Sequence, residues 1–385
     1  MKRLLPLVIL ISVIFTLASP PVFALGAEGR AQPEVSAPAA ILMEKETGTV
    51  LYEKNAHEPG FPASITKIMT MLLIVEDIEA GRLKLDDTVI ASERAASFGG
   101  SCVYLEAGEQ MSVSDMLKCI AVVSANDCAV AMAEHISGSE EKFVERMNKR
   151  AKELGLENTH FSNCSGLFDD GAHFTTAYDV ALMSRELMKH ETIMNYTSIW
   201  MDTIRDGAFG LTNTNRLIRF YKGATGLKTG STSKAKFCIS ASAERDGLGL
   251  VAVIMGSPTR DVRNAAAASL LDFGFANYAF LQKESEAQAG IPVKGGVKNT
   301  LSTVSEGFSQ VIDKGADKKL TAETVLPESV AAPVKKGDKI GEIIYKTDGV
   351  ELGRADIVAD EDIEKISFFT LLPRMFKTMI GAKRG

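Results

Sequence analysis

Two segments with the pattern of paired β-strands flank a long stretch of helical pattern, and no other feature limits the possible folds as much. The first β-hairpin covers residues 40–53 and the second covers residues 236–255. The helical patterns between them include residues 113–119, 127–135 and 140–154. Strands from both ends of a helical region can bury their apolar faces together in one sheet. The sequence therefore predicts an α+β fold with one antiparallel sheet rather than repeated βαβ units.

The pattern changes at about residue 282, where short alternating strands separated by glycine-containing turns begin. The clearest hairpin there runs from Lys339 to Leu352. A chain of 385 residues is long enough for two domains. We predict a first domain at residues 39–281, closed by an aromatic-rich helix at residues 272–280, and a small β-rich domain at residues 282–362.

The first residues have the pattern of a secretory signal peptide. Lys2 and Arg3 precede an apolar run at residues 4–17, and small residues suited to cleavage end at Ala24. A retained membrane anchor is the alternative, but the run is short for a bilayer core about 30 Å thick. We predict a signal peptide at residues 1–24, a flexible tail at residues 25–38 and an exported remainder.

The composition argues against two kinds of partner. The net charge of -6 argues against a nucleic acid, because phosphate binding requires a basic surface. The five cysteines are scattered, the five histidines are dispersed, and neither a CxxC nor an HExxH motif occurs. The sequence therefore predicts no metal site and no cofactor.

The last segment, residues 363–385, has the pattern of an amphipathic helix with basic residues nearby. The helix either docks on its own domain or lies on a membrane surface, where apolar side chains enter the lipid boundary and basic side chains meet anionic headgroups. We favour the membrane anchor, because a chain terminus is free to leave its domain. Its apolar positions are Ile366, Phe369, Leu372, Phe376, Met379 and Ile380.

Serine and lysine three residues apart occur four times, so this spacing alone identifies no site. Ordinary composition gives about one such pair by chance. Only one pair, Ser64 and Lys67, opens an apolar segment, which continues to Val75 and contains no other charge. The four pairs begin at Ser64, Ser139, Ser231 and Ser233.

The setting of Ser64 and Lys67 indicates nucleophilic chemistry. A helix that is apolar all round is buried, and residues three apart share one of its faces. Burial favours the neutral amine of Lys67, which can take the proton of the Ser64 hydroxyl. The alternative is a lysine that extends past its apolar neighbours to solvent. The pair alone does not decide between the two interpretations.

Two further motifs change that balance. Ser124-Ala125-Asn126 is the only Ser-x-Asn in the chain, and Lys228-Thr229-Gly230 is the only Lys-Thr-Gly. Taken singly, the first motif is explained by a helix cap and the second by an ordinary strand entry. Together with Ser-x-x-Lys, and in this order, they form the signature of penicillin-recognising serine enzymes.

On these motifs the chain resembles the low-molecular-mass penicillin-binding proteins, the serine-type D-alanyl-D-alanine carboxypeptidases of peptidase family S11, over essentially its whole length. Gly166 and residues 173–179 also match the family's habits, and the closest resemblance is to its sporulation-associated members. Ala125 stands where the family commonly has glycine, and Cys164 and Ser165 also depart from its usual pattern. The resemblance implies a transpeptidase domain like those of penicillin-binding proteins and β-lactamases, followed by the β-rich domain and the amphipathic helix.

The resemblance also implies the reaction. Ser64 would attack the penultimate D-alanine of a peptidoglycan stem peptide that ends in D-Ala-D-Ala, with Lys67 as general base and Ser124 as proton relay. β-Lactams would acylate the same serine at the outer face of the cytoplasmic membrane. The implied substrate-binding residues are Asn126, Lys228, Thr229, Gly230, Ser231 and Arg263, with the backbone N–H groups of Ser64 and Ser231 as oxyanion hole.

Other functions remain open at this stage. A class A β-lactamase shares the three motifs but usually lacks a second β-rich domain. A β-lactam or cell-wall binding protein with little turnover would need the same nucleophile. A Ser-His-Asp hydrolase is disfavoured, because the chain contains no Gly-x-Ser-x-Gly.

Overall fold

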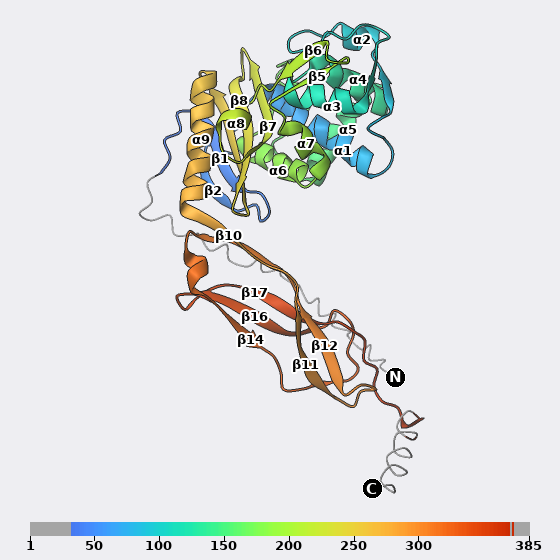
Figure 1. The fold of residues 1–385 in the computed structure, drawn as a ribbon, viewed down its shortest axis with the longest axis vertical. Helices are drawn as coiled ribbons and strands as arrows, with labels where there is room; N and C mark the ends of the chain where they lie inside the picture. The colour runs from blue at the N-terminus through green and yellow to red at the C-terminus, as the bar shows by residue number, and fades with distance from the viewer. Residues whose placement is uncertain (1–31, 370–371, 373–385) are drawn as a thin grey trace, which may run out of the picture. The chain divides into compact units, whose positions relative to one another are not determined.

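The computed structural model describes residues 32–369 and 372 (Figure 1). The predicted signal peptide at residues 1–24 therefore lies outside the described residues, as does most of the predicted amphipathic helix. The start of that segment pairs with the β-rich part through isolated antiparallel β-bridges. Ile363 forms one with Val334, and Lys365 forms one with Gly296.

The first part of the chain contains the predicted antiparallel sheet, with both predicted hairpins in place. Five strands pair in the order β2-β1-β9-β8-β7, so the N-terminal hairpin lies beside strands that follow it by some two hundred residues (Figure 1). Strand β7 forms one edge. The strands are β1 (Ala39–Glu44), β2 (Val50–Lys54), β7 (Ala224–Thr232), β8 (Lys236–Arg245) and β9 (Leu248–Ser257).

The two faces of this sheet are covered by different helices. Ile41 and Val253 belong to the large core that the sheet shares with the helices of the middle region. On the other face, Gly274 of α9 (Arg260–Asn277) lies so close to Leu42 and Leu250 that an added Cβ would be 2.5 Å from Leu250. The sheet is therefore buried on both faces, which explains why its central strand β9 has no polar side chain from Leu248 to Met255.

Helix α1 (Lys67–Glu79) runs through the middle of the helical layer. A turn of 3-10 helix, η1 (Ala63–Thr66), leads into it, and Lys67 to Val75 are all buried. The buried helix predicted from Ser64 onward is confirmed. The other helices are α2 (Glu93–Ala96), α3 (Val113–Val122), α4 (Asn126–Ser137), α5 (Glu140–Glu153), α6 (Ala177–Met188), α7 (Glu191–Thr197) and α8 (Leu217–Phe220). Two small two-stranded sheets pair β3 (Thr88–Ile90) with β4 (Gln110–Ser112) and β5 (Met201–Ile204) with β6 (Phe209–Thr212).

The helix predicted at residues 272–280 is wrong at both ends. Helix α9 begins at Arg260 and ends at Asn277, and strand β10 (Tyr278–Lys283) follows at once. Strand β10 crosses the predicted domain boundary at residue 281 and pairs with β13 (Phe308–Asp313). Aromatic residues suit strands as well as helices, so pairing with a distant strand decided the conformation here.

The β-rich part contains a six-stranded sheet in the order β14-β16-β17-β12-β11-β15. The predicted hairpin after Lys339 is confirmed, with Asp348 and Gly349 at positive φ in its turn. The apolar side chains of the β-rich part form two small cores, one around Ile357 and one around Leu301. The remaining elements are β11 (Ala287–Lys294), β12 (Thr300–Ser305), η2 (Ala316–Lys319), β14 (Leu320–Val325), β15 (Val330–Ala331), β16 (Lys339–Thr347) and β17 (Val350–Ala359).

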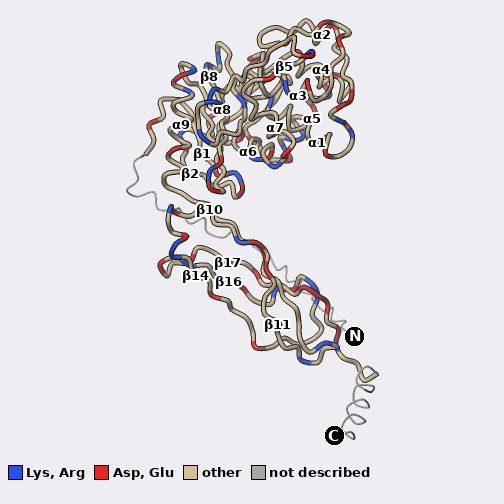
Figure 2. The backbone as a smooth tube through the Cα atoms, in the orientation of Figure 1, with Lys and Arg blue, Asp and Glu red and all other residues tan. Residues whose placement is uncertain are grey.

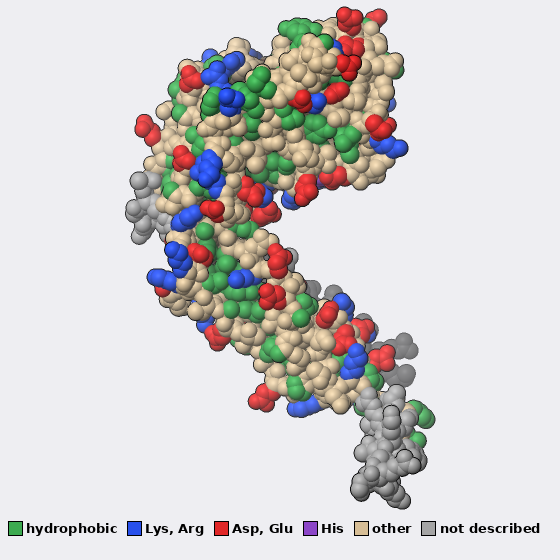
Figure 3. All heavy atoms as spheres, in the orientation of Figure 1, with side chains coloured by type: hydrophobic (Ala, Val, Ile, Leu, Met, Phe, Trp, Pro, Cys, Tyr) green, Lys and Arg blue, Asp and Glu red, His purple; other side chains and the backbone are tan. Residues whose placement is uncertain are grey.

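Charged residues of both signs are interspersed along both parts of the chain (Figure 2), and the face drawn in Figure 3 carries no extended single-sign area among the described residues. Within residues 32–369, no helix has both the length and the apolar character needed to cross a membrane.

Candidate active site

The predicted nucleophile lies in a tightly packed turn at the start of the central helix. Ser64 is in η1, next to Ala63, whose φ of 48° is strained for a residue with a side chain. Two glycines approach this turn from other elements. A Cβ on Gly166 would lie 1.8 Å from the Ala63 oxygen, and one on Gly230 would lie 2.9 Å from the Ser64 nitrogen. Both positions therefore require glycine, which allows the backbones to meet around Ser64.

Lys67 points from the first turn of α1 toward Ser64. Its Nζ lies 3.1 Å from Ser64 Oγ, 2.6 Å from Asn126 Oδ1 and 2.6 Å from the carbonyl oxygen of Ser165. The side chain is fully buried, so the alternative of a lysine reaching solvent is wrong. Burial lowers the pKa of Lys67 from 10.5 to about 7, against the weaker opposing effect of nearby acidic groups such as Asp127.

Ser124 lies in the connection between α3 and α4, and Asn126 lies at its end. Ser124 has a φ of 67°, and its Oγ is buried without a hydrogen-bond partner among the described residues. Asn126 opens α4, accepts the hydrogen bond from Lys67 and donates its Nδ2 to the Gly99 oxygen at 2.8 Å. The Asn126 amide thus joins the lysine to the loop that carries Ser101, another residue at the cleft.

The Lys-Thr-Gly motif lies on the edge strand β7. Lys228 is buried, and its Nζ donates to the Thr229 oxygen at 2.9 Å. Burial lowers the pKa of Lys228, and the charges of Lys67 and Arg263 lower it further. The Thr229 hydroxyl donates to the Thr214 hydroxyl at 2.8 Å. The unpaired edge of β7 packs against η1, so the motif and the nucleophile face each other.

Arg263, near the start of α9, brings a second buried cation to the same region. Burial lowers the pKa of Arg263 to about 10, and its guanidinium contacts the Cys238 oxygen at 3.4 Å. At neutral pH it remains charged. Because buried cations are costly unless they meet an anion, this end of the site is suited to a carboxylate.

A cleft of about 580 Å³ opens over these groups. Six of the nine predicted site residues line it, whereas Lys67, Asn126 and Lys228 lie behind its wall. Lys67 and Lys228 hydrogen-bond to Ser64 and Thr229 of the lining, and the Asn126 N–H donates to the Ser101 oxygen at 2.7 Å. The structure thus brings together all nine residues predicted from the sequence. The lining consists of Ser64, Ser101, Ser124, Trp200, Thr212, Asn213, Thr214, Arg216, Phe220, Thr229, Gly230, Ser231, Arg260 and Arg263.

His173 supports the turn that carries the nucleophile, and the sequence motifs did not predict this role. The Ser162 N–H donates to His173 Nδ1 at 3.0 Å, so Nε2 carries the proton and donates to the Thr66 hydroxyl at 2.6 Å. Thr66 in turn donates to the Ala63 oxygen at 2.8 Å. Burial lowers the pKa of His173 to about 4, so the ring is neutral at ordinary pH. The only signal in the sequence was the match of residues 173–179 to the family.

Comparison with known proteins decides the family. The model of the family Peptidase_S11, described as D-alanyl-D-alanine carboxypeptidase, matches residues 27–259. The chain belongs to this family. A second model, described as the C-terminal domain of penicillin-binding protein 5, matches residues 275–365. The predicted resemblance is confirmed, as is the predicted fold apart from its C-terminal amphipathic helix, most of which lies outside the described residues. This is a serine D-alanyl-D-alanine carboxypeptidase with a transpeptidase-type domain followed by an all-β domain.

Individual relatives cover nearly the whole of this carboxypeptidase. The D-alanyl-D-alanine carboxypeptidase DacF of Bacillus subtilis is 45% identical over 97% of this chain and 98% of its own. The DacA enzyme of Escherichia coli K12 is 32% identical over 90% of this chain and 88% of its own. The crystal structure of penicillin-binding protein 5 from Haemophilus influenzae is 30% identical, has a TM-score of 0.78, and covers 88% of this chain and 100% of its own.

Proposed function

We propose that this carboxypeptidase removes the terminal D-alanine from peptidoglycan stem peptides through an acyl ester on Ser64. The observation that carries the proposal is the position of Lys67, a buried amine with a pKa near 7 and its Nζ 3.1 Å from the Ser64 hydroxyl. A base is most effective when its pKa lies near the working pH.

The hydrogen bonds of Lys67 support its role as general base. A neutral amine has two N–H donors, and the oxygens of Asn126 and Ser165 accept both at 2.6 Å. The remaining lone pair is then available to the Ser64 hydroxyl. In the proposed step, Ser64 Oγ bonds to the carbonyl carbon of the penultimate D-alanine while its proton moves to Lys67.

Breakdown of the tetrahedral intermediate requires a proton on the leaving amine. We assign its delivery to Ser124, whose buried Oγ lines the cleft and has no competing partner among the described residues. The C–N bond breaks, D-alanine leaves, and water then hydrolyses the ester to regenerate Ser64. The N–H groups of Ser64 and Ser231 would stabilise the negative oxygen, a role supported by the close approach of Gly230 to the Ser64 nitrogen.

The cations at the far end of the cleft support recognition of a C-terminal carboxylate. Thr229 and Arg263 line the cleft and Lys228 lies directly behind it, while none of the lining residues is acidic. We assign the carboxylate of the terminal D-alanine to these three residues and the substrate amide to Asn126. A β-lactam carries an amide and a carboxylate at similar separation, and it would acylate Ser64 in the same orientation.

We further propose that the enzyme acts outside the cytoplasmic membrane. The predicted signal peptide and the amphipathic segment at residues 363–385 support export followed by attachment to the outer face of the cytoplasmic membrane. A substrate in the cell wall requires the same location.

The function is tested by measuring two products with one preparation. The mature enzyme should release D-alanine from a diacyl-Lys-D-Ala-D-Ala peptide, and Ser64→Ala should release none above background. A β-lactamase would instead hydrolyse penicillin with rapid turnover and leave the peptide intact. A binding protein would be acylated once by penicillin and would release no D-alanine, and either outcome would overturn the proposal.

A further inference from the structure

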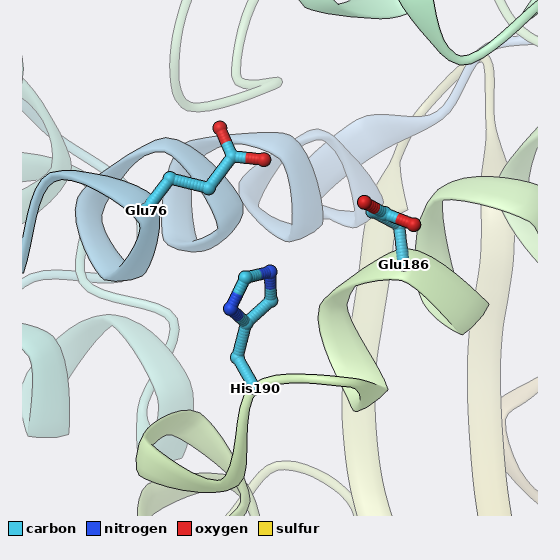
Figure 4. A group of neighbouring side chains, drawn as sticks. All are labelled: Glu76, Glu186 and His190. Carbon is cyan, nitrogen blue, oxygen red and sulfur yellow. The ribbon is translucent and has the colours of Figure 1, made fainter. Parts of the chain in front are cut away.

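Three potential metal ligands meet at the far end of α1 from Ser64. Glu76 comes from α1, Glu186 from α6, and His190 from the link between α6 and α7. One ligand atom of each lies within 4.8 Å of the other two. Figure 4 shows a ring nitrogen of His190 directed toward the space between the two carboxylates.

The orientation of His190 is fixed by a fourth residue. His190 Nδ1 lies 2.7 Å from Glu79 Oε2. A carboxylate accepts this hydrogen bond, so Nδ1 carries a proton, and in the neutral ring Nε2 is then the nitrogen with a lone pair to offer a metal ion. A carboxylate that orients a histidine in this way is typical of metal sites, because it fixes the tautomer and makes the opposite nitrogen a better ligand.

The Nε2 atom itself has no protein partner. It is inaccessible to solvent and forms no hydrogen bond with any of the described residues. A buried polar atom without a partner costs about 1–3 kcal/mol, so native proteins usually provide one. The side chains of His190, Glu76 and Glu186 are 14%, 23% and 20% exposed, so an ion could enter from the surface.

Two basic residues hold the carboxylates in place. Arg150 bridges them, with Nε 2.8 Å from Glu76 Oε1 and Nη2 2.7 Å from Glu186 Oε1. Lys189 Nζ lies 2.7 Å from Glu186 Oε2, and its side chain is 61% exposed and able to move away. These cations preorganise the ligands but also weaken the attraction for another positive ion.

We propose that Glu76, Glu186 and His190 bind a zinc-class divalent transition-metal ion, with Glu79 orienting His190. An imidazole with two carboxylates suits Zn²⁺ better than Mg²⁺ or Ca²⁺, which prefer oxygen ligands alone. Water would complete the coordination. The ion would join α1 to α6 and to the start of α7, and so would stabilise the helix that begins beside the nucleophile without taking part in the reaction.

The proposal is tested by titrating the purified full-length chain, freed of metal by a chelator, with ZnCl₂ in a calorimeter. We expect one ion per chain and a higher unfolding midpoint with Zn²⁺. Both effects should disappear in His190→Gln. Glu79→Gln should weaken binding about 10- to 100-fold, and Lys189→Ala should tighten it. The exposed His57 lies outside the cluster, and His57→Ala should bind as wild type does.

Acylation by a fluorescent penicillin, measured without metal, verifies that each variant is folded and should be unchanged in all of them. An anomalous difference peak at the zinc edge should appear between the three side chains in Zn²⁺-soaked crystals. The proposal is wrong if Zn²⁺ fails to bind the wild type, or if it binds wild type and His190→Gln equally. It is also wrong if the anomalous peak lies elsewhere.

Discussion

Replacement of Asn126 by aspartate tests the role of Lys67 with very little change in shape. In the wild type, a pKa of about 7 leaves about half of the Lys67 side chains neutral at pH 7, whereas a pKa of 10.5 would leave about one in 3000. The lowered pKa means that the buried site disfavours the ammonium form of Lys67, relative to the neutral amine, by about 5 kcal/mol more than water does. Acylation should therefore fall about tenfold per pH unit below pH 7.

Asn126→Asp places a carboxylate where an amide oxygen now lies 2.6 Å from the Lys67 amine. The negative charge stabilises the ammonium form, so the pKa of Lys67 should rise by about 1 to 3 pH units. At pH 7 acylation should fall about 5- to 500-fold, because the neutral fraction falls by that factor from its wild-type value of about one half. The loss should be recovered as the pH rises toward 9 or 10.

The assay is the second-order rate of labelling by a fluorescent penicillin between pH 5.5 and 10. Asn126→Ala is the matched control, since it removes the same hydrogen bonds without adding charge and should lower the rate without moving the acidic limb upward. His173 cannot produce a limb near pH 7, because its pKa is about 4. Identical pH profiles for Asn126→Asp and Asn126→Ala would refute the assignment of Lys67 as the titrating base.

Three further changes test the oxyanion hole, the buried histidine and the membrane anchor. Gly230→Ala should reduce acylation about 100- to 1000-fold, because its Cβ would lie 2.9 Å from the Ser64 nitrogen and displace a proposed oxyanion donor. The control Gly210→Ala, with open space around its Cβ, should be active. Equal acylation rates for the two variants would contradict this role of Gly230. Urea unfolding should show that His173→Gln abolishes an acid-dependent loss of about 3 kcal/mol. Below its ordinary pKa of 6.5 the unfolded histidine binds a proton that the folded one refuses until about pH 4, so stability falls as the pH drops through that window. Removal of residues 368–385 should release the protein from membranes in sedimentation assays while preserving the hydrogen bond from the Ile366 N–H to the Gly295 oxygen; continued sedimentation would count against the anchor.

The sequence predicted the parts of the fold that depend on local pattern. Both hairpins of the main sheet, the buried helix α1 and the hairpin after Lys339 could be predicted because apolar periodicity and turn residues mark them directly. Helix α9 was predicted with the wrong bounds. The residues from Tyr278 onward are aromatic and apolar, and only their pairing with β13 made them a strand.

In the candidate site, too, motifs predict some residues, whereas other contacts depend on the folded structure. Residue types with strong chemistry, such as Ser64, Lys67 and Lys228, could be predicted from motifs. The Ser165 carbonyl that accepts from Lys67 is a backbone atom, so no residue type indicates it. Glu186 and His190 are four residues apart, but Glu76 joins them only because α1 packs against α6, and no spacing in the sequence indicates that contact.

In the proposed reaction, Ser64 forms a covalent acyl intermediate during turnover. The most direct measurement is mass spectrometry of the enzyme quenched during reaction with a D-Ala-D-Ala peptide, followed by peptide mapping. We expect an added mass equal to the peptide minus its terminal D-alanine, located on Ser64 and absent from Ser64→Ala. D-Alanine release with an adduct on another residue, or with the same adduct in Ser64→Ala, would contradict it.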